Sequence, residues 1–249
     1  MCGINGIFGI SDREKAEPVI QVMNNSLAHR GPDNEGFFHS QRTTLGHRRL
    51  SIIDLSPESN QPMTSADGRF TIVYNGELYN YKELKFDLQR APSGGGEAYL
   101  FKTNSDTEVI LASYSRWGKD CLNKFNGMYA FAIWDEKNKE LFIARDRLGI
   151  KPLYYCNSES IFLFSSEIRA LLSSGLVNRK INERSLSDYL RYQTVHAPDT
   201  IIENVKMLMP GNCMTVSENK FEIKEYWSVF SKPGNETESH SYEKICSDV

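Results

Sequence analysis

The chain has few cysteines and no CxxC pair among them. Five cysteines are scattered at irregular spacing over 249 residues. This odd number and wide spacing fit neither a disulfide framework nor a zinc site, and we expect no metal in this chain. The distribution favours a reducing cytoplasm as the compartment. Three of the cysteines are expected to be small buried hydrophobic residues, namely Cys121, Cys156 and Cys213.

The sequence also lacks long hydrophobic runs and blocks of basic residues. Its opening apolar run, Ile4–Ile10, is too short to cross a membrane, and no basic segment precedes it as a signal peptide would require. The formal net charge is -3, and lysines and arginines do not gather in long blocks. We therefore expect a protein that binds neither nucleic acid nor a membrane.

Strand patterns dominate what is present. With 40% hydrophobic residues, the chain is sufficient for one large core or two small domains. Met128–Trp134 is apolar on both faces, so this strand must be covered on both sides. Further strand patterns follow at hairpin spacing, at Leu141–Arg145, Leu153–Cys156 and Ile161–Ser165. The sequence therefore predicts two stacked antiparallel sheets with helices as outer layers.

Local signals predict the helices and one turn. Pro18 favours a helix that begins with it and runs to His29. A capping box, Ser105–Glu108, predicts a second helix from Asp106 to Arg116. Asn75-Gly76 is expected to form a turn after the strand Arg69–Tyr74. Shorter helices are expected at Glu167–Ser174 and Asn182–Arg191, followed by a hairpin of Cys213–Val216 with Phe221–Tyr226.

Cys2 is the first candidate for chemistry. Methionine is usually removed when the next side chain is small, and removal of Met1 would place a thiol and a free α-amine on one residue. A thiol with a pKa of about 8.5 is only a few per cent thiolate at neutral pH, so it needs a base. An α-amine with a pKa of about 7.7–8.0 is suited to that task. On this residue alone, a cysteine without a role is the alternative.

Five further motifs follow Cys2 along the chain. They are His29–Asp33, Gly46–Ile52, Tyr74–Asn80, Ser105–Ile110 and Arg145–Tyr155. In order and spacing, over residues 2–227, the set resembles the class II glutamine amidotransferases, and most closely the glutaminase half of asparagine synthetases. The resemblance implies an α+β fold, the N-terminal-nucleophile αββα sandwich of two antiparallel sheets between helices, in agreement with the strand pattern.

The resemblance implies an oxyanion site at Asn75 and Gly76. Hydrolysis of a side-chain amide by Cys2 forms a tetrahedral intermediate whose negative oxygen needs preorganised donors. Asn75 and Gly76 match the residues of the family that supply a side-chain amide and a backbone N–H. A plain hairpin turn is the alternative reading of this dipeptide.

Three charged residues match the family's grip on the amino-acid head of glutamine. Arg49 matches the arginine that binds the carboxylate, for which a planar guanidinium is suited. Asp106 matches the acidic residue that pairs with the substrate ammonium, although a carboxylate there also complements a helix dipole. Glu77 is expected to assist at the ammonium site. Arg48 is expected to point to the opposite face from Arg49, because neighbouring strand residues do so.

Several motif residues have no chemistry that the sequence assigns. A Cys–His pair of the papain type, with His29 or His47 as base, is an alternative that the α-amine makes unnecessary. Arg145–Tyr155 is expected to be a structural strand pair. The residues without an assigned role are His29, Arg30, Asp33, His47 and Asp146.

The resemblance also indicates what the chain lacks. Asparagine synthetases activate aspartate with ATP through a loop of the form SGGxDS, which Ser93–Ala98 resembles only superficially. We expect a plain loop there, no cofactor in this chain, and ATP and Mg only in a synthetase domain that is absent from it. The expected divisions are a glutaminase core at 2–175, a connector at 176–227 and a tail at 228–249.

The sequence thus predicts an enzyme that hydrolyses L-glutamine to glutamate and ammonia through a Cys2 thioester. The ammonia would pass to a synthetase domain or subunit for asparagine synthesis from aspartate and ATP, and a homodimer is compatible with this. Two alternatives stay open: another acceptor, such as a sugar or an antibiotic precursor, or a non-catalytic scaffold of the same fold. The intact Cys2, Arg49, Asn75 and Asp106 argue against the scaffold.

Overall fold

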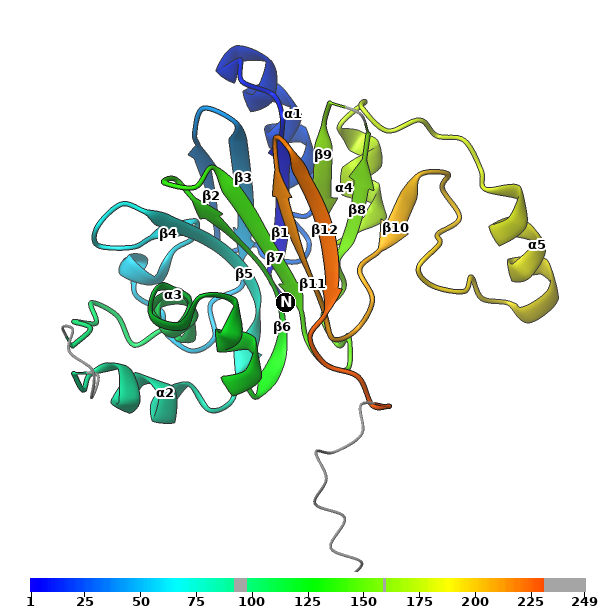
Figure 1. Ribbon diagram of the computed structural model, residues 1–249. Coiled ribbons are helices and arrows are strands. Elements are labelled where there is room, and N and C mark those ends of the chain that lie inside the picture. Colours follow the sequence, from blue (N-terminus) through cyan, green and yellow to red (C-terminus); the bar gives the residue numbers. More distant parts are fainter. Residues whose placement is uncertain (92–97, 159, 231–249) are drawn as a thin grey trace, which may run out of the picture.

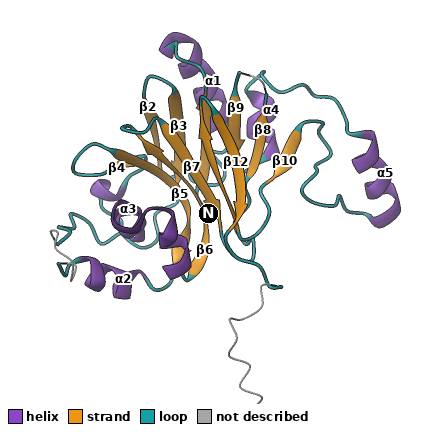
Figure 2. Cartoon of the chain, viewed as in Figure 1, coloured by secondary structure: helices purple, strands orange, loops and turns teal. Residues whose placement is uncertain are grey.

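Two six-stranded sheets lie face to face in the computed structural model, which describes residues 1–91, 98–158 and 160–230 (Figures 1 and 2). All paired strands are antiparallel. The first sheet has the order β10 (Val205–Met207), β8 (Tyr154–Asn157), β9 (Phe162–Ser165), β1 (Gly3–Phe8), β3 (Thr43–Arg49), β2 (Asn34–His39). The second has the order β12 (Lys220–Glu225), β11 (Asn212–Ser217), β7 (Glu140–Arg145), β6 (Gly127–Asp135), β5 (Phe70–Leu78), β4 (Met63–Thr64).

Strand β6 shows why the two sheets stack. Its apolar residues alternate between two buried surfaces, as the two-residue period of a strand requires. Phe131 and Ile133 belong to the core that the second sheet shares with helices, whereas Ala132 and Trp134 belong to the core between the sheets. Burial of both faces confirms the sequence prediction for this strand.

Helices cover both outer faces of the paired sheets. On the first sheet, α1 (Arg13–Asn25) and α4 (Ile168–Ser173) pack against β1, β3, β8 and β9. On the second, α3 (Asp106–Trp117) packs against β5 and α2 (Tyr81–Leu88) packs against α3. The result is the predicted four-layer α+β sandwich. Short 3-10 helices occupy Pro57–Ser59 and Gly118–Lys124.

The segment after residue 175 contributes both a peripheral helix and three sheet strands. Helix α5 (Glu183–Tyr192) lies to one side of the sheets in Figure 1. Strand β10 pairs with β8, and β11 pairs with β7. The expected division at residue 175 therefore does not coincide with the limits of the sheets, which extend to Glu225.

Two local predictions were wrong. Helix α1 begins at Arg13 rather than at Pro18, because Asp12 caps it by accepting a 3.0 Å hydrogen bond from the backbone N–H of Glu14. Asn75-Gly76 is not a turn: both residues lie inside β5, where they pair with Ala130 and Tyr129 of β6. The continuous partner strand overrides the local turn preference of this dipeptide.

Other predictions concern the capping box, the cysteines and the glycine-rich loop. Ser105 caps α3 by accepting from the N–H of Thr107, while Glu108 binds the backbone of residues 102 and 103 in place of the reciprocal bond. Cys121, Cys156 and Cys213 are buried, as predicted. The loop at 92–97 falls outside the described residues. Within the described ranges, the helices are too short or too polar to span a membrane.

Candidate active site

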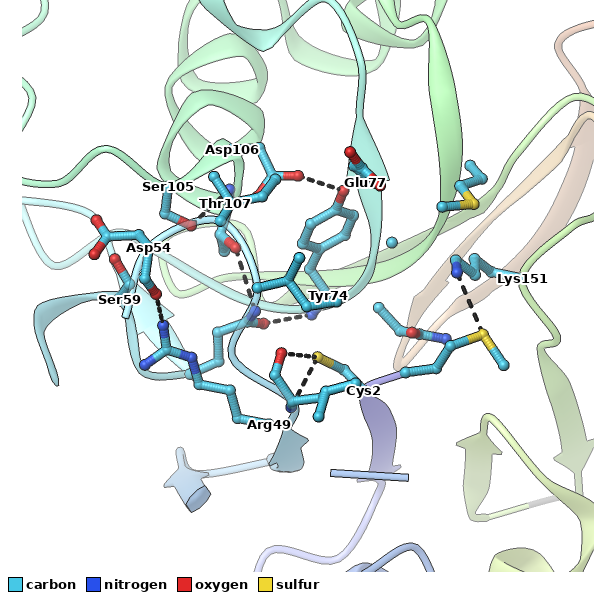
Figure 3. A pocket seen from close by; sticks show the side chains of 18 residues that line it. Cys2, Arg49, Asp54, Ser59, Tyr74, Glu77, Ser105, Asp106, Thr107 and Lys151 are labelled. Atoms are coloured by element: carbon cyan, nitrogen blue, oxygen red, sulfur yellow. Dashed lines mark hydrogen bonds between the residues drawn. The ribbon is translucent and has the colours of Figure 1, made fainter. Parts of the chain in front are cut away.

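One pocket brings together the two residues that precede β1 and residues from the end of β3, the middle of β5 and the start of α3 (Figure 3). These segments are far apart in the sequence, and they meet because β1 and β5 belong to sheets that face each other. Every residue predicted for the site lines this pocket: Cys2, Arg49, Asn75, Gly76, Glu77 and Asp106.

The Cys2 thiol lies against the backbone of Leu50. The N–H of Leu50 donates to Cys2 Sγ at 3.4 Å, and the Leu50 carbonyl lies 3.6 Å from the same sulfur. Burial raises the pKa of this thiol, while the Leu50 N–H, the chain's α-amine and Arg49 act in the opposite direction. A thiol with a raised pKa attacks only when a neighbouring base removes its proton.

Arg30 holds the Cys2 backbone in place. Its Nε donates to the Cys2 carbonyl at 2.9 Å, and its Nη1 forms a 2.9 Å ion pair with Glu167. Glu167 also contacts His29 at 2.9 Å. Two motif residues without an assigned role in the sequence thus belong to this contact network: Arg30 holds the Cys2 backbone, and His29 contacts the Glu167 that pairs with Arg30. Among the described residues, no histidine lines the pocket, so the Cys–His alternative has no geometric support.

The Arg49 guanidinium enters the pocket from the end of β3. It donates to the carbonyls of Asp54 and Ser56 and to Asn60 Oδ1, which ties the loop after β3 to the site. No carboxylate in the described part of the chain pairs with it. Arg48 points the other way, toward Glu35 at 2.8 Å, as the alternation of strand residues predicted. Arg49 is therefore free to bind a carboxylate that enters the pocket.

Asn75 and Gly76 lie on β5 and line the pocket that also contains Cys2. Asn75 is 1% exposed, and its Nδ2 has no hydrogen-bond partner among the described residues. A buried unpaired donor costs free energy, and such groups concentrate at functional sites. At Gly76, a Cβ would lie 2.3 Å from the Met128 carbonyl oxygen, so the close approach of β6 requires glycine. An unpaired amide donor in the same pocket as a thiol fits a site for a developing oxyanion.

Asp106, at the first position of α3, is 4% exposed. Its Oδ2 accepts hydrogen bonds from the Tyr74 hydroxyl at 2.8 Å and from the Leu78 N–H at 3.0 Å. Burial raises the pKa of this carboxyl, and these two bonds act in the opposite direction. The carboxylate therefore both ties α3 to β5 and faces the pocket. Glu77, half-buried, lines the pocket beside it.

Sequence reasoning missed several residues of the site. Gln61 accepts from the Tyr74 N–H at 2.6 Å and donates to Thr107 at 3.2 Å, which couples β5 to α3. The Lys151 ammonium also reaches the pocket, whereas the sequence predicts only a structural strand pair for the motif that contains it. The only sequence signal that could have identified Lys151 as a site residue is its position within the motif Arg145–Tyr155. Further lining residues are Leu50, Ile52, Ile53, Asp54, Ser59, Ser105 and Met128.

His47 connects the two sheets behind the site. Its Nε2 lies 3.1 Å from the carbonyl oxygen of Tyr74, the residue before Asn75. Complete burial lowers the pKa of His47 to about 4. The imidazole is therefore neutral at pH 7 and serves as a hydrogen-bonded spacer rather than as a base.

Comparison with known proteins adds to this geometry. A family model described as a glutamine amidotransferase domain matches residues 1–227. The chain is 37% identical over 236 residues to the glutamine-hydrolysing asparagine synthetase 3 of Bacillus subtilis, covering 93% of this chain and 37% of that protein. It is 38% identical over 251 residues to a putative asparagine synthetase 2 of Methanocaldococcus jannaschii, covering 91% and 46%. The chain thus spans less than half the length of these relatives.

A solved structure supports the fold. The glutamine phosphoribosylpyrophosphate amidotransferase of B. subtilis matches with a TM-score of 0.66 at 22% identity, covering 91% of this chain and 49% of that chain. At this identity, the likeness shows the sandwich architecture alone.

Proposed function

Because the chain belongs to the glutamine amidotransferase family, we propose that it hydrolyses glutamine to glutamate and ammonia for asparagine synthesis from aspartate and ATP. The single observation that carries this proposal is one pocket that contains Cys2, the Asn75 amide and Arg49. Within the described residues, the Asn75 amide nitrogen has no hydrogen-bond partner and Arg49 has no carboxylate partner. The names of the two relatives support asparagine as the product.

The proposed reaction begins at the α-amine that Cys2 gains when Met1 is removed. The amine takes the thiol proton, and the thiolate attacks the side-chain amide carbon of glutamine. Asn75 Nδ2 and the Gly76 N–H stabilise the resulting oxyanion. The C–N bond then breaks, ammonia leaves with the proton that the amine returns, and a thioester remains. Water hydrolyses the thioester to glutamate and regenerates Cys2.

The amino-acid head of glutamine has a complementary partner for each of its charges. Arg49, already oriented by the carbonyls of Asp54 and Ser56, binds the carboxylate with its planar fork. Asp106 and Glu77 bind the ammonium. Burial of either charge without a partner would be costly, so these residues select an α-amino acid over a simple amide.

The ammonia acceptor lies outside this chain in the proposal. A synthetase domain or subunit receives the ammonia, and ATP and Mg belong to that partner. The described cysteines are unpaired, which supports a reducing cytoplasm as the setting.

The test is ammonia release from glutamine by the purified chain, with a Cys2→Ala variant as control. We expect release that disappears in the variant, while circular dichroism shows an unchanged fold. An intact mass establishes that Met1 has been removed. Equal release by both proteins, or none from a chain that lacks Met1 and is supplied with its synthetase partner, would contradict the proposal.

A further inference from the structure

Lys151 is a buried cation in the pocket that the reaction described above does not use. The residue is 5% exposed and lines the same pocket as Cys2. Its Nζ lies 3.3 Å from Met1 Sδ, its one side-chain partner within the described ranges. In Figure 3 the Lys151 side chain points to the sulfur of the residue that precedes Cys2. Removal of Met1 deletes this contact and leaves the ammonium unpartnered beside the new N-terminus.

The backbone of Lys151 is fixed from both sides. Its N–H donates to Asp146 Oδ2 at 3.0 Å, and its carbonyl accepts from Arg145 Nε at 2.7 Å. The same Asp146 side chain accepts from the N–H groups of Tyr129 and Ile150. Arg145 and Asp146 therefore hold the start of the Lys151 side chain at a defined place at the edge of the pocket.

Most of the other charged side chains near Cys2 have a partner of their own. Arg30 pairs with Glu167, and Asp106 accepts from Tyr74 and Leu78. In the described part of the chain, Arg49 and Lys151 are the cations of the pocket without a carboxylate within 4.0 Å. The charged groups that face this region are Arg30, Arg49 and Lys151 among the cations, and Asp33, Asp54, Glu77, Asp106, Asp146 and Glu167 among the anions.

The contact with Met1 sets an upper limit on the distance between the Lys151 ammonium and the Cys2 nitrogen. Five covalent bonds join Met1 Sδ to that nitrogen, which limits their separation to about 7 Å. With the 3.3 Å contact, the ammonium is within about one Debye length of the future α-amine, and burial reduces screening further. Two like charges within this distance repel each other when water screens them only partly. The α-amine, with an ordinary pKa of about 7.7–8.0 against about 10.4 for lysine, is the group that loses its proton.

We propose that Lys151 is a positioning residue that keeps the freed Cys2 α-amine in its neutral, proton-accepting form. The inference rests on the proposed glutaminase function and deepens it. Lys151 acts in the same direction on the α-amine of Met1, whose pKa is lowered. Burial is the largest cause, and Arg30 and Lys151 lower the pKa further, whereas Cys2 and Asp33 raise it.

The test compares pH profiles of kcat/KM for glutamine hydrolysis in wild type, Lys151→Met and Lys151→Arg. Methionine keeps the length of the side chain without its charge, and arginine keeps the charge. We expect Lys151→Met to move the acidic limb upward by about one pH unit, which lowers the rate about fivefold at pH 7 and less than twofold at pH 9. Lys151→Arg should keep the limb within about 0.3 pH units of wild type.

Two results would overturn the inference. A uniform loss at all pH values in Lys151→Met would mean that Lys151 has only a structural role. An equal defect in Lys151→Arg would mean that the lysine itself carries the proton. If Lys151→Met does not fold, the wild-type profile decides: an acidic limb above about pH 8 would show that the amine is not held neutral.

A measurement without turnover separates this inference from the proposed function. In protein labelled with ¹³C-cysteine, NMR titration follows Cys2 directly, and intact mass verifies loss of Met1 in each variant. We expect the amine to titrate at a higher pH in Lys151→Met than in wild type, and equal values would refute the role of Lys151. Loss of ammonia release in Cys2→Ala tests the glutaminase function independently of either result.

Discussion

The hydroxyl of Tyr74 donates a 2.8 Å hydrogen bond to Asp106 Oδ2, across the boundary between β5 and the first turn of α3. Both groups are buried. The bond therefore couples the strand that carries Asn75 and Gly76 to the carboxylate proposed to bind the substrate ammonium.

Tyr74→Phe should weaken glutamine binding, more at low pH than at high pH. The Tyr74 bond lowers the pKa of Asp106 against the effect of burial, so its loss leaves the carboxyl protonated up to a higher pH. We expect KM to rise about 3- to 10-fold, the equivalent of about 0.7–1.4 kcal/mol, with a larger rise at pH 6 than at pH 8. Steady-state kinetics of ammonia release measure this. Tyr129→Phe, which removes a hydroxyl bound to Tyr226, is the control, and an equal effect in both would contradict the prediction.

Arg49→Lys should raise KM for glutamine with a smaller effect on kcat. Lysine keeps the charge but loses the planar fork and the bonds to the loop after β3. We expect about a 10- to 100-fold increase, corresponding to about 1.4–2.8 kcal/mol. The matched control is Arg48→Lys, one residue away on the opposite face. An unchanged KM in Arg49→Lys would remove Arg49 from the site.

Asn75→Ala should lower kcat without destabilising the fold. The Asn75 amide makes no hydrogen bond through Nδ2 in the described part of the structure, so its removal breaks no native bond there. Loss of one oxyanion donor typically lowers kcat about 10²- to 10³-fold. Kinetics and urea unfolding of the same variant separate the two effects. A large loss of stability with little change in kcat would show that Asn75 is structural.

The pH dependence of stability should carry the signature of His47. Its folded pKa of about 4 lies below the ordinary value of 6.5, because the residue is completely buried. As the pH falls from 6.5 to 4, the unfolded chain therefore binds a proton that the folded chain does not, and the free energy of unfolding decreases. Between pH 7.5 and 4.5 this group should remove about 2–3 kcal/mol.

Urea unfolding across this pH range tests the contribution of His47. His47→Gln keeps a hydrogen-bonding side chain without the titration, so its stability should fall less steeply as the pH decreases. If the free energy of unfolding falls equally steeply with decreasing pH in wild type and in His47→Gln, the pH dependence belongs to other groups.

The candidate site could be predicted from the sequence because its residues occupy recognisable motifs. Cys2, Arg49 and Asp106 were identified by their chemistry and by family resemblance, and the structure gathers them in one pocket. The opposed orientations of Arg48 and Arg49 followed from strand alternation alone.

Lys151 and Gln61 were not found in this way. Lys151 belongs to a motif with no chemical signal, and Gln61 has a role only through its contacts with Tyr74 and Thr107. Such contacts join residues 13 and 46 positions apart, and only the folded chain brings them together.

The sequence by itself determined the family, the sandwich fold and Cys2 as the candidate nucleophile, because motifs, periodicity and side-chain chemistry are local properties. The tertiary structure decided whether Asn75-Gly76 forms a turn or continues the strand β5, because pairing with β6 outweighs the turn preference of these two residues. It also decided which charges are compensated. Burial and neighbouring groups fix the pKa of Asp106, His47 and Cys2, and these neighbours come from strands and helices distant in the chain.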